Sequence, residues 1–300
     1  MVGGGGGAET FTFKSIETTK EVMLLTKAIE KPEKAYKNIK FLGSPDGRII
    51  RMMSEFLEPQ GRFRRSGVRD TIVFFGSARI KPRQEALREV RSLRAKLRAK
   101  LGSRLALKEM LREAEVLLEM SKYYDDAVEL ARLLTEWSMS LKVSNRFVVC
   151  SGGGPGIMEA ANRGAFQSGG KSIGMNISLP FEQFANRFIT KGLSFEFHYF
   201  FMRKFWFAYL AKALVVFPGG FGTFDELMEI LTLLQTGKIK KKMAVVIYGS
   251  EYWNETVNWE HMVARGVVSK RDLKLFRYAD SPQEAFEYLK KSLMRNYPSE

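Results

Sequence analysis

The chain has 300 residues, a formal net charge of +15 at pH 7, one cysteine and two histidines. This length can bury a large core in one domain with appendages. The single cysteine, Cys150, excludes an internal disulfide and favours a reducing compartment, so we expect a cytoplasmic protein. No CxxC, HExxH or paired acidic ligand spacing occurs, and we therefore predict no metal site.

Residues 1–70 are predicted to extend the main domain. Five consecutive glycines follow Val2 and predict a solvated tail over residues 1–15. Residues 16–70 combine helical apolar spacing with a Gly-Ser-Pro-Asp-Gly loop at 43–47. This pattern favours an N-terminal helical cover over an independent domain.

A strongly basic segment follows the first predicted strand. Residues 81–112 contain eleven Lys or Arg and three Glu, a local charge of +8. Leucines at helical spacing predict a basic amphipathic helix or helical hairpin, within an insertion over residues 81–120. We interpret the charge as a solvated face and expect nucleic-acid binding that is weak and nonspecific at most.

Five short apolar runs alternate with helical patterns along residues 71–300. Continuous rather than alternating hydrophobicity indicates strands covered on both faces, and hence a parallel sheet between helices. Right-handed crossovers then make an α/β, doubly wound, Rossmann-like domain whose ligands bind at the carboxyl ends of the strands. The predicted strands are Ile72–Phe75, Phe147–Cys150, Ser172–Ile177, Leu214–Phe217 and Met243–Tyr248.

The most apolar stretch, residues 195–217, is interrupted by four charged side chains. It falls short of the roughly 18 uninterrupted apolar residues that a spanning helix needs, so we expect no membrane partner. It indicates an aromatic helix followed by a buried strand. Aromatic side chains on such a helix more often belong to a core or a subunit interface than to a base-stacking platform, and we expect a homo-oligomer.

Glycine loops follow the first two predicted strands. Gly76-Ser77 comes directly after the first, and Gly152-Gly153-Gly154 follows the second, with Pro155 predicted at the first helical position. Glu159 is either a ligand contact or a first-turn carboxylate that suits the helix dipole. The dinucleotide motif GxGxxG needs a glycine at its sixth position, but that position is Ile157 counted from Gly152 and Glu159 counted from Gly154. No GxxxxGK run occurs either. A dinucleotide-binding dehydrogenase and a P-loop nucleoside triphosphatase are therefore both disfavoured.

The fourth predicted strand ends in Pro218-Gly219-Gly220-Phe221-Gly222-Thr223-Phe224-Asp225-Glu226, which opens a helix. Bare backbone N–H groups and the macrodipole at a helix N-terminus favour an anion, and glycines let a phosphate approach closely. Glu226, predicted in the first turn, would repel a phosphate and indicates chemistry instead. The alternative is a capping box, in which Thr223 and Glu226 satisfy the first N–H groups of the helix, although a cap needs no preceding glycines.

Together, the Arg203-Lys204 pair on the aromatic helix and the PGGxGTxxE run at 218–226 resemble the LOG ("lonely guy") family. Its members are cytokinin riboside 5′-monophosphate phosphoribohydrolases, long misannotated as lysine decarboxylases. The resemblance extends from about Ile72 to the C-terminus and is closest to the longer bacterial branch. It implies hydrolysis of the N-glycosidic bond of purine nucleoside 5′-monophosphates, with adenine or an N6-modified adenine as the base.

The same resemblance implies that Glu226 and Arg203 are catalytic. Hydrolysis at C1′ develops oxocarbenium character, and a carboxylate there activates the water or stabilises the cationic sugar. Arg203 would orient the carboxylate and the substrate through its rigid donor fork. The predicted substrate and phosphate ligands are Gly76, Ser77, Gly152, Gly153, Gly154, Glu182, Lys204, Gly219, Gly220, Phe221, Gly222, Thr223, Asp225 and Thr232.

Two other classes stay open. A non-catalytic nucleotide sensor would keep the glycine loops without needing Glu226. A DNA-associated Rossmann-like protein would explain the charge of +15 but has no use for PGGxGTxxE. A pyridoxal-phosphate lysine decarboxylase is disfavoured, because nothing places a lysine as an internal aldimine with an acidic partner for the ring nitrogen, and we predict no cofactor.

Overall fold

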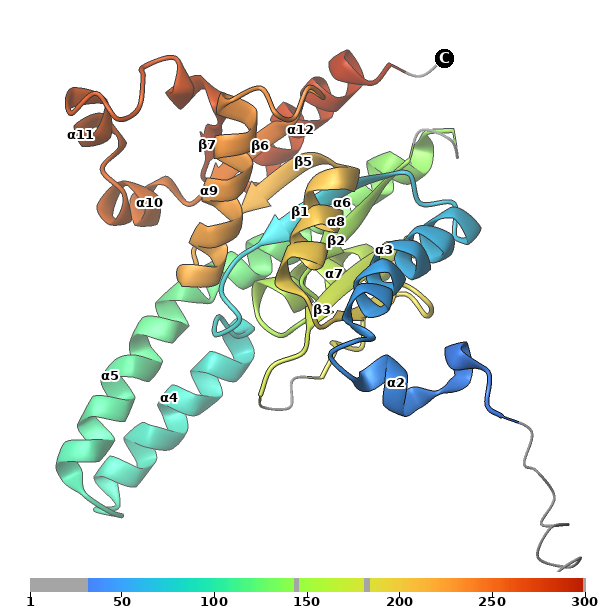
Figure 1. Ribbon diagram of the computed structural model, residues 1–300. Helices are drawn as coiled ribbons and strands as arrows, with labels where there is room; N and C mark the ends of the chain where they lie inside the picture. The colour runs from blue at the N-terminus through green and yellow to red at the C-terminus, as the bar shows by residue number, and fades with distance from the viewer. Residues whose placement is uncertain (1–31, 143–145, 181–183, 299–300) are drawn as a thin grey trace, which may run out of the picture. The chain divides into compact units, whose positions relative to one another are not determined.

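The computed structural model describes residues 32–142, 146–180 and 184–298 (Figure 1). The chain divides into two units, Met1–Arg51 and Met52–Glu300. The described part of the first unit holds a 3-10 helix, Ala35–Lys37, the helix α2, Ile39–Gly43, and the start of α3, Arg48–Arg65. Asn38 caps α2 by accepting a hydrogen bond from the Phe41 N–H at 2.9 Å. The expected tail at 1–15 and residues 16–31 of the expected cover lie outside the described residues.

The second unit is built on a seven-stranded, wholly parallel sheet in the order β4-β3-β2-β1-β5-β6-β7. This order confirms the predicted doubly wound, Rossmann-like fold. The strands are β1 Asp70–Phe75, β2 Phe147–Ser151, β3 Ser172–Ile177, β4 Ser194–Phe197, β5 Ala211–Val216, β6 Ala244–Tyr248 and β7 Arg277–Ala279. The edge strands β4 and β7 were not predicted from the sequence, because both are short and neither carries a continuous apolar run.

Helices cover both faces of the sheet, as the continuous apolar strands require. In β1, Ile72 and Phe74 face one layer of helices while Val73 and Phe75 face the other, and all four side chains are buried. The first layer contains α6 Lys122–Ser140, α7 Ile157–Gln167 and α12 Pro282–Asn296. The second contains residues 52–65 of α3, α8 Phe200–Leu210, α9 Phe221–Gln235, α10 Ser250–Thr256 and α11 Trp259–Ala264.

The predicted basic insertion is a helical hairpin between β1 and α6. Its helices, α4 Arg83–Arg98 and α5 Arg104–Met120, pack side by side (Figure 1) around a small core of Val90, Leu93, Leu107 and Ala114. None of the described helices is long and apolar enough to cross a membrane.

The winding of the sheet reverses between β1 and β5. From β1 the chain proceeds outward through β2, β3 and β4, then returns to the other side of β1 and continues through β5, β6 and β7. In open α/β sheets the crevice at such a switch point is the usual ligand site. Here Gly76-Ser77 follows β1, and the run that begins at Pro218 follows β5. Two of the predicted glycine loops therefore lie at the switch point.

Candidate active site

A cleft of about 710 Å³ opens at this switch point. Its floor and walls come from the loops after β1, β2, β3 and β5, from α8 and α9, and from the last turn of α5. The hairpin thus reaches the cleft at one end. The lining residues are Phe75, Gly76, Ser77, Ala78, Arg79, Ile80, Leu117, Met120, Gly152, Met158, Ile177, Leu179, Phe200, Arg203, Phe207, Pro218, Gly219, Gly220, Phe221, Gly222, Thr223, Glu226 and Tyr252.

Backbone hydrogen bonds centred on Ser77 hold the glycine loops together. The Ser77 N–H donates to the Pro218 carbonyl at 3.0 Å, and the Ser77 carbonyl accepts from the Ile157 N–H, also at 3.0 Å. Tyr252 adds a side-chain bond by donating its hydroxyl to the Gly219 carbonyl at 2.9 Å. Loops held this way present a fixed backbone to a ligand.

Helix α7 begins later than the sequence suggests. Pro155 was expected at its first position, but the helix starts at Ile157 and Gly156 precedes it with φ of +70° and ψ of −134°. A helix cannot include a residue with that backbone, so the expectation for Pro155 is wrong. Glu159 does lie in the first turn, where its Oε1 accepts a hydrogen bond from the Tyr124 hydroxyl at 2.8 Å.

Gly156→Ala is expected to destabilise the fold strongly, because a Cβ there would lie 2.3 Å from the Ser77 carbonyl oxygen in addition to requiring positive φ. Gly169 has the same φ of +70° with nothing within 4 Å of its missing Cβ, which makes Gly169→Ala the matched control. The free energy of unfolding in urea should fall by about 1–2 kcal/mol for the control and by clearly more for Gly156→Ala. Equal losses would show that the loops do not pack this closely.

Helix α9 starts at Phe221, with Gly220 as its N-cap and no side-chain cap. Thr223 is therefore the third helical residue, and the capping box considered above is absent. Glu226 lies in the second turn rather than the first, because the helix begins two residues before Thr223. The uncapped N-terminus lines the cleft, and backbone N–H groups at such an end attract anions.

Glu226 and Arg203 lie next to each other in the cleft. Arg203 Nη2 is 3.7 Å from Glu226 Oε1, and their side chains are 16% and 6% exposed. Neither Glu226 Oε1 nor Arg203 Nε has a hydrogen-bond partner within the described part of the chain. Buried polar atoms are normally paired, so these two are candidates for pairing with a ligand.

Burial controls the ionisation of this pair. It raises the pKa of Glu226 to about 7, against the opposing charges of Arg203 and Lys204. Burial also lowers the pKa of Arg203, which the carboxylates of Glu226 and Asp225 partly offset. A carboxyl group with a pKa near neutrality, buried in a cleft beside a guanidinium, is a typical candidate for acid–base chemistry.

Lys204, next to Arg203 on α8, forms ion pairs with two carboxylates of α9. Its Nζ lies 2.8 Å from Asp225 Oδ2 and 3.0 Å from Glu229 Oε2. Neither Lys204 nor Asp225 belongs to the cleft lining, although both were predicted as ligands. The pairs tie α8 to α9 and so help to hold Arg203 beside Glu226.

Of the other predicted ligands, eight line the cleft and three of the described residues do not. Gly76, Ser77, Gly152, Gly219, Gly220, Phe221, Gly222 and Thr223 line the cleft. Thr232 is exposed, outside the lining, and donates its hydroxyl to the Met228 carbonyl at 2.7 Å. Gly153 and Gly154 are buried without lining the cleft, and Glu182 lies outside the described residues.

Several lining residues were not singled out from the sequence. Leu117 and Met120 come from the basic hairpin, Met158 from α7, and Tyr252 from α10. They belong to segments far apart in the chain, and no local pattern marks them. For Phe200 and Phe207 the sequence did offer a signal, because both lie on the aromatic helix that carries Arg203.

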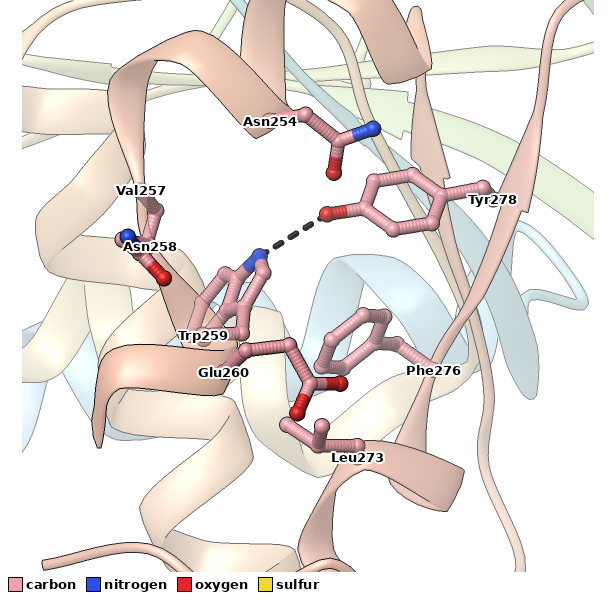
Figure 2. A pocket seen from close by; sticks show the side chains of 8 residues that line it. All are labelled: Asn254, Val257, Asn258, Trp259, Glu260, Leu273, Phe276 and Tyr278. Atoms are coloured by element: carbon pink, nitrogen blue, oxygen red, sulfur yellow. Dashed lines mark hydrogen bonds between the residues drawn. The ribbon is translucent and has the colours of Figure 1, made fainter. Parts of the chain in front are cut away.

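A second cavity, of about 340 Å³, contains none of the predicted site residues (Figure 2). It is lined by Asn254, Val257, Asn258, Trp259, Glu260, Leu273, Phe276 and Tyr278. Two of these side chains are bonded to each other, since Trp259 Nε1 donates to the Tyr278 hydroxyl at 2.8 Å. The Arg203–Glu226 pair lines the larger cleft, as do Gly76, Gly152, Gly219, Gly220 and Gly222.

A doubly wound parallel sheet, with glycine loops at its switch point and a buried guanidinium beside a buried carboxylate, defines a Rossmann-like α/β protein whose cleft holds an ion pair. Residues 158–289 match the family model described as "Possible lysine decarboxylase". The chain is also 27% identical over 170 residues to "Probable cytokinin riboside 5'-monophosphate phosphoribohydrolase LOGL3" of Oryza sativa subsp. japonica, covering 56% of this chain and 75% of that protein. Both matches agree with the resemblance to the LOG family that Arg203-Lys204 and the run at 218–226 carry.

Two solved structures are similar to this chain. One is the molybdenum cofactor binding protein from the phototrophic bacterium Rippkaea orientalis, with a TM-score of 0.40 and 17% identity, covering 56% of this chain and 86% of that one. The other is the structural-genomics target TM1055, with a TM-score of 0.41 and 21% identity, covering 57% of this chain and 89% of that one.

Proposed function

We propose that the protein hydrolyses the N-glycosidic bond of purine nucleoside 5′-monophosphates, releasing the free base and ribose 5-phosphate. The observation that carries this proposal is the buried Arg203–Glu226 pair beside the uncapped, glycine-rich N-terminus of α9. The name of the rice relative describes a phosphoribohydrolase of this kind. The base would be adenine or an N6-modified adenine.

In this mechanism the 5′-phosphate binds at the N-terminus of α9, where Gly220 and Gly222 leave open space. Binding there positions the ribose so that C1′ approaches Glu226. The carboxylate accepts a proton from water as the water oxygen bonds to C1′, or stabilises the positive charge on the sugar. The base departs with the electron pair of the glycosidic bond and takes up a proton. Arg203 orients Glu226 and the substrate.

The direct test is incubation with a panel of nucleoside monophosphates, including adenosine, N6-modified adenosine, guanosine and cytidine 5′-monophosphates. Free base would be separated by chromatography. Release from the adenine nucleotides supports the proposal. Saturable binding without release would favour the nucleotide sensor, and failure to bind any nucleotide would leave only the DNA-associated class.

We expect log(kcat/KM) to rise with pH up to about 7 and then level off, because burial raises the pKa of Glu226 to about 7 and only the ionised carboxylate accepts a proton. The substrate phosphate also titrates, with a second pKa of about 6. Glu226→Gln should remove the limb near 7 and keep any limb due to phosphate. A limb near 7 that survives in this variant would belong to another group.

The family description also names lysine decarboxylation, which requires pyridoxal phosphate on a lysine. None of the described residues that line the cleft is a lysine. Lys204, the nearest in sequence to the catalytic pair, is held by Asp225 and Glu229. The residues of this cleft therefore do not fit that cofactor.

We also propose that the protein acts as a homo-oligomer in the cytoplasm. Four aromatic side chains of α8 are between 37% and 57% exposed, whereas Trp206 and Phe207 of the same helix are buried. Exposed aromatic rows of this kind typically mark subunit contacts. The exposed set is Phe200, Phe201, Phe205 and Tyr209. Light scattering after gel filtration should give at least twice the mass of 34.2 kDa, and Phe201→Ser with Tyr209→Ser should reduce it.

A further inference from the structure

The turn of the basic hairpin holds two leucines in solvent. Lys100 has φ of +53°, the Leu101 N–H donates to the Lys96 carbonyl at 3.0 Å, and the Lys100 N–H to the Leu97 carbonyl at 3.3 Å. This is a helix-ending motif in which the apolar residue after the left-handed position usually packs back onto the helix. Leu101 remains 62% exposed, and Leu105, in the first turn of α5, is 79% exposed.

The same turn is strongly cationic. No Asp or Glu occurs between Glu89 and Glu109, while that interval contains seven Lys or Arg. Among the described residues only Arg94 of these seven forms an ion pair, with Glu115. The other cations, all exposed, are Arg91, Lys96, Arg98, Lys100, Arg104 and Lys108.

We propose that this hairpin tip, residues 96–108, docks on an anionic lipid surface. Leu101 and Leu105 would enter the headgroup region while the flanking Lys and Arg meet lipid phosphates. Exposed apolar side chains set among cations are the usual signature of such interfacial contacts. The contact is peripheral, since none of the described helices can span a membrane.

Exposed leucines among cations fit an anionic lipid surface better than a nucleic acid or a second copy of the tip. A nucleic acid would be attracted to the cations, but its hydrated phosphate backbone gives two exposed leucines nothing to pack against. A second copy of the tip would bring its own cations against these. The sequence analysis predicted no membrane partner because no apolar run is long enough to span a bilayer. That criterion detects spanning helices and does not detect two leucines exposed at the end of a hairpin.

The tip can be altered without disturbing the fold. Leu101 and Leu105 are absent from the small core of the hairpin, which is formed by Val90, Leu93, Leu107 and Ala114. Neither leucine lines the cleft. Met110, 51% exposed on α5 and outside the tip, provides a matched apolar control.

The experiment is co-sedimentation of the full chain with vesicles of phosphatidylcholine alone or containing 30% phosphatidylglycerol. We expect binding to the anionic vesicles only, weakened by salt. Leu101→Ser with Leu105→Ser should reduce the partition coefficient at least about tenfold, and Met110→Ser should leave it unchanged. Replacing Arg88, Arg91, Arg94 and Arg98 with Gln should weaken binding and flatten its salt dependence, with Tm nearly unchanged for every variant.

A tryptophan at position 101 adds a local readout. Leu101→Trp should show a blue shift in fluorescence with anionic vesicles and none with neutral ones. No binding, equal binding to both vesicle types, or indifference to the double Leu→Ser variant would overturn the proposal. Submicromolar DNA binding at physiological salt that survives the double variant, with no vesicle binding, would identify a nucleic-acid surface. Loss of oligomeric mass in that variant would identify a subunit contact.

Discussion

Glu226→Gln is expected to lower kcat for nucleoside monophosphate hydrolysis by at least about a hundredfold. The carboxylate lines the cleft, is almost fully buried, and has a pKa raised to about 7 by that burial. Gln keeps the size and polarity of the side chain but can neither accept a proton from water nor offset a positive charge on the sugar. Single-turnover hydrolysis at saturating substrate would measure the loss.

The same substitution should change stability only slightly. In the unfolded chain the carboxyl ionises near 4.5, and in the folded protein near 7, so its contribution to stability falls as pH rises from 4.5 to 7. At pH 8 Gln removes a buried ionised carboxylate whose Oε1 has no hydrogen-bond partner among the described residues, which is favourable. It also removes an attraction to Arg203 across 3.7 Å, which is unfavourable. These effects oppose each other.

Glu229→Gln is the matched control. It lies on the same helix and outside the cleft lining, and Lys204 keeps its ion pair with Asp225 when the Glu229 pair is lost, so kcat should stay within a few-fold of the parent. Arg203→Ala should lose activity much as Glu226→Gln does. If Glu226→Gln kept its turnover and lost stability, the role of the carboxylate would be structural.

Adenosine is expected to be a far poorer substrate than adenosine 5′-monophosphate. The uncapped start of α9 and its glycines have no use for an uncharged 5′-hydroxyl, whereas a phosphate would engage several backbone N–H groups at once. Remote binding energy of this kind positions the reacting sugar, so its loss should reduce kcat/KM by at least about a hundredfold. Equal turnover of nucleoside and nucleotide would exclude a phosphate site.

Gly220→Ala tests the same site from the protein side. Nothing lies within 4 Å of a Cβ at Gly220, and its φ is −91°, so the fold should accept alanine while an approaching phosphate would not. KM for the monophosphate should rise and Tm should stay constant. Gly219→Ala is unsuitable, because its Cβ would lie 2.1 Å from Thr223 Oγ1.

Gly43→Ala is the control for that substitution. Nothing lies within 4 Å of a Cβ at Gly43, at the end of α2, and the residue does not line the cleft. KM should be unchanged. A similar rise in KM for both variants would show that the effect of Gly220→Ala does not come from the cleft.

The sequence by itself determined the class of fold and several of the loops that line the cleft. Uninterrupted apolar runs such as those of β1 and β5 can be buried only in a sheet covered on both faces, which is a local property of composition. Glycines directly after those strands predicted where the cleft lies, because parallel strands place their carboxyl ends at one edge of the sheet. The two motifs that contain Arg203 and Glu226 were also recognised from the sequence.

Only the tertiary structure decided how these pieces meet. The starts of α7 and α9 depend on the backbone at Gly156 and Gly220, which loop contacts fix, so Pro155 and Glu226 fell one turn or less from their expected places. The raised pKa of Glu226 comes from the desolvation of a whole site. The burial and the pairing of a side chain depend on residues that are distant in the chain. A pattern within one segment therefore cannot predict them.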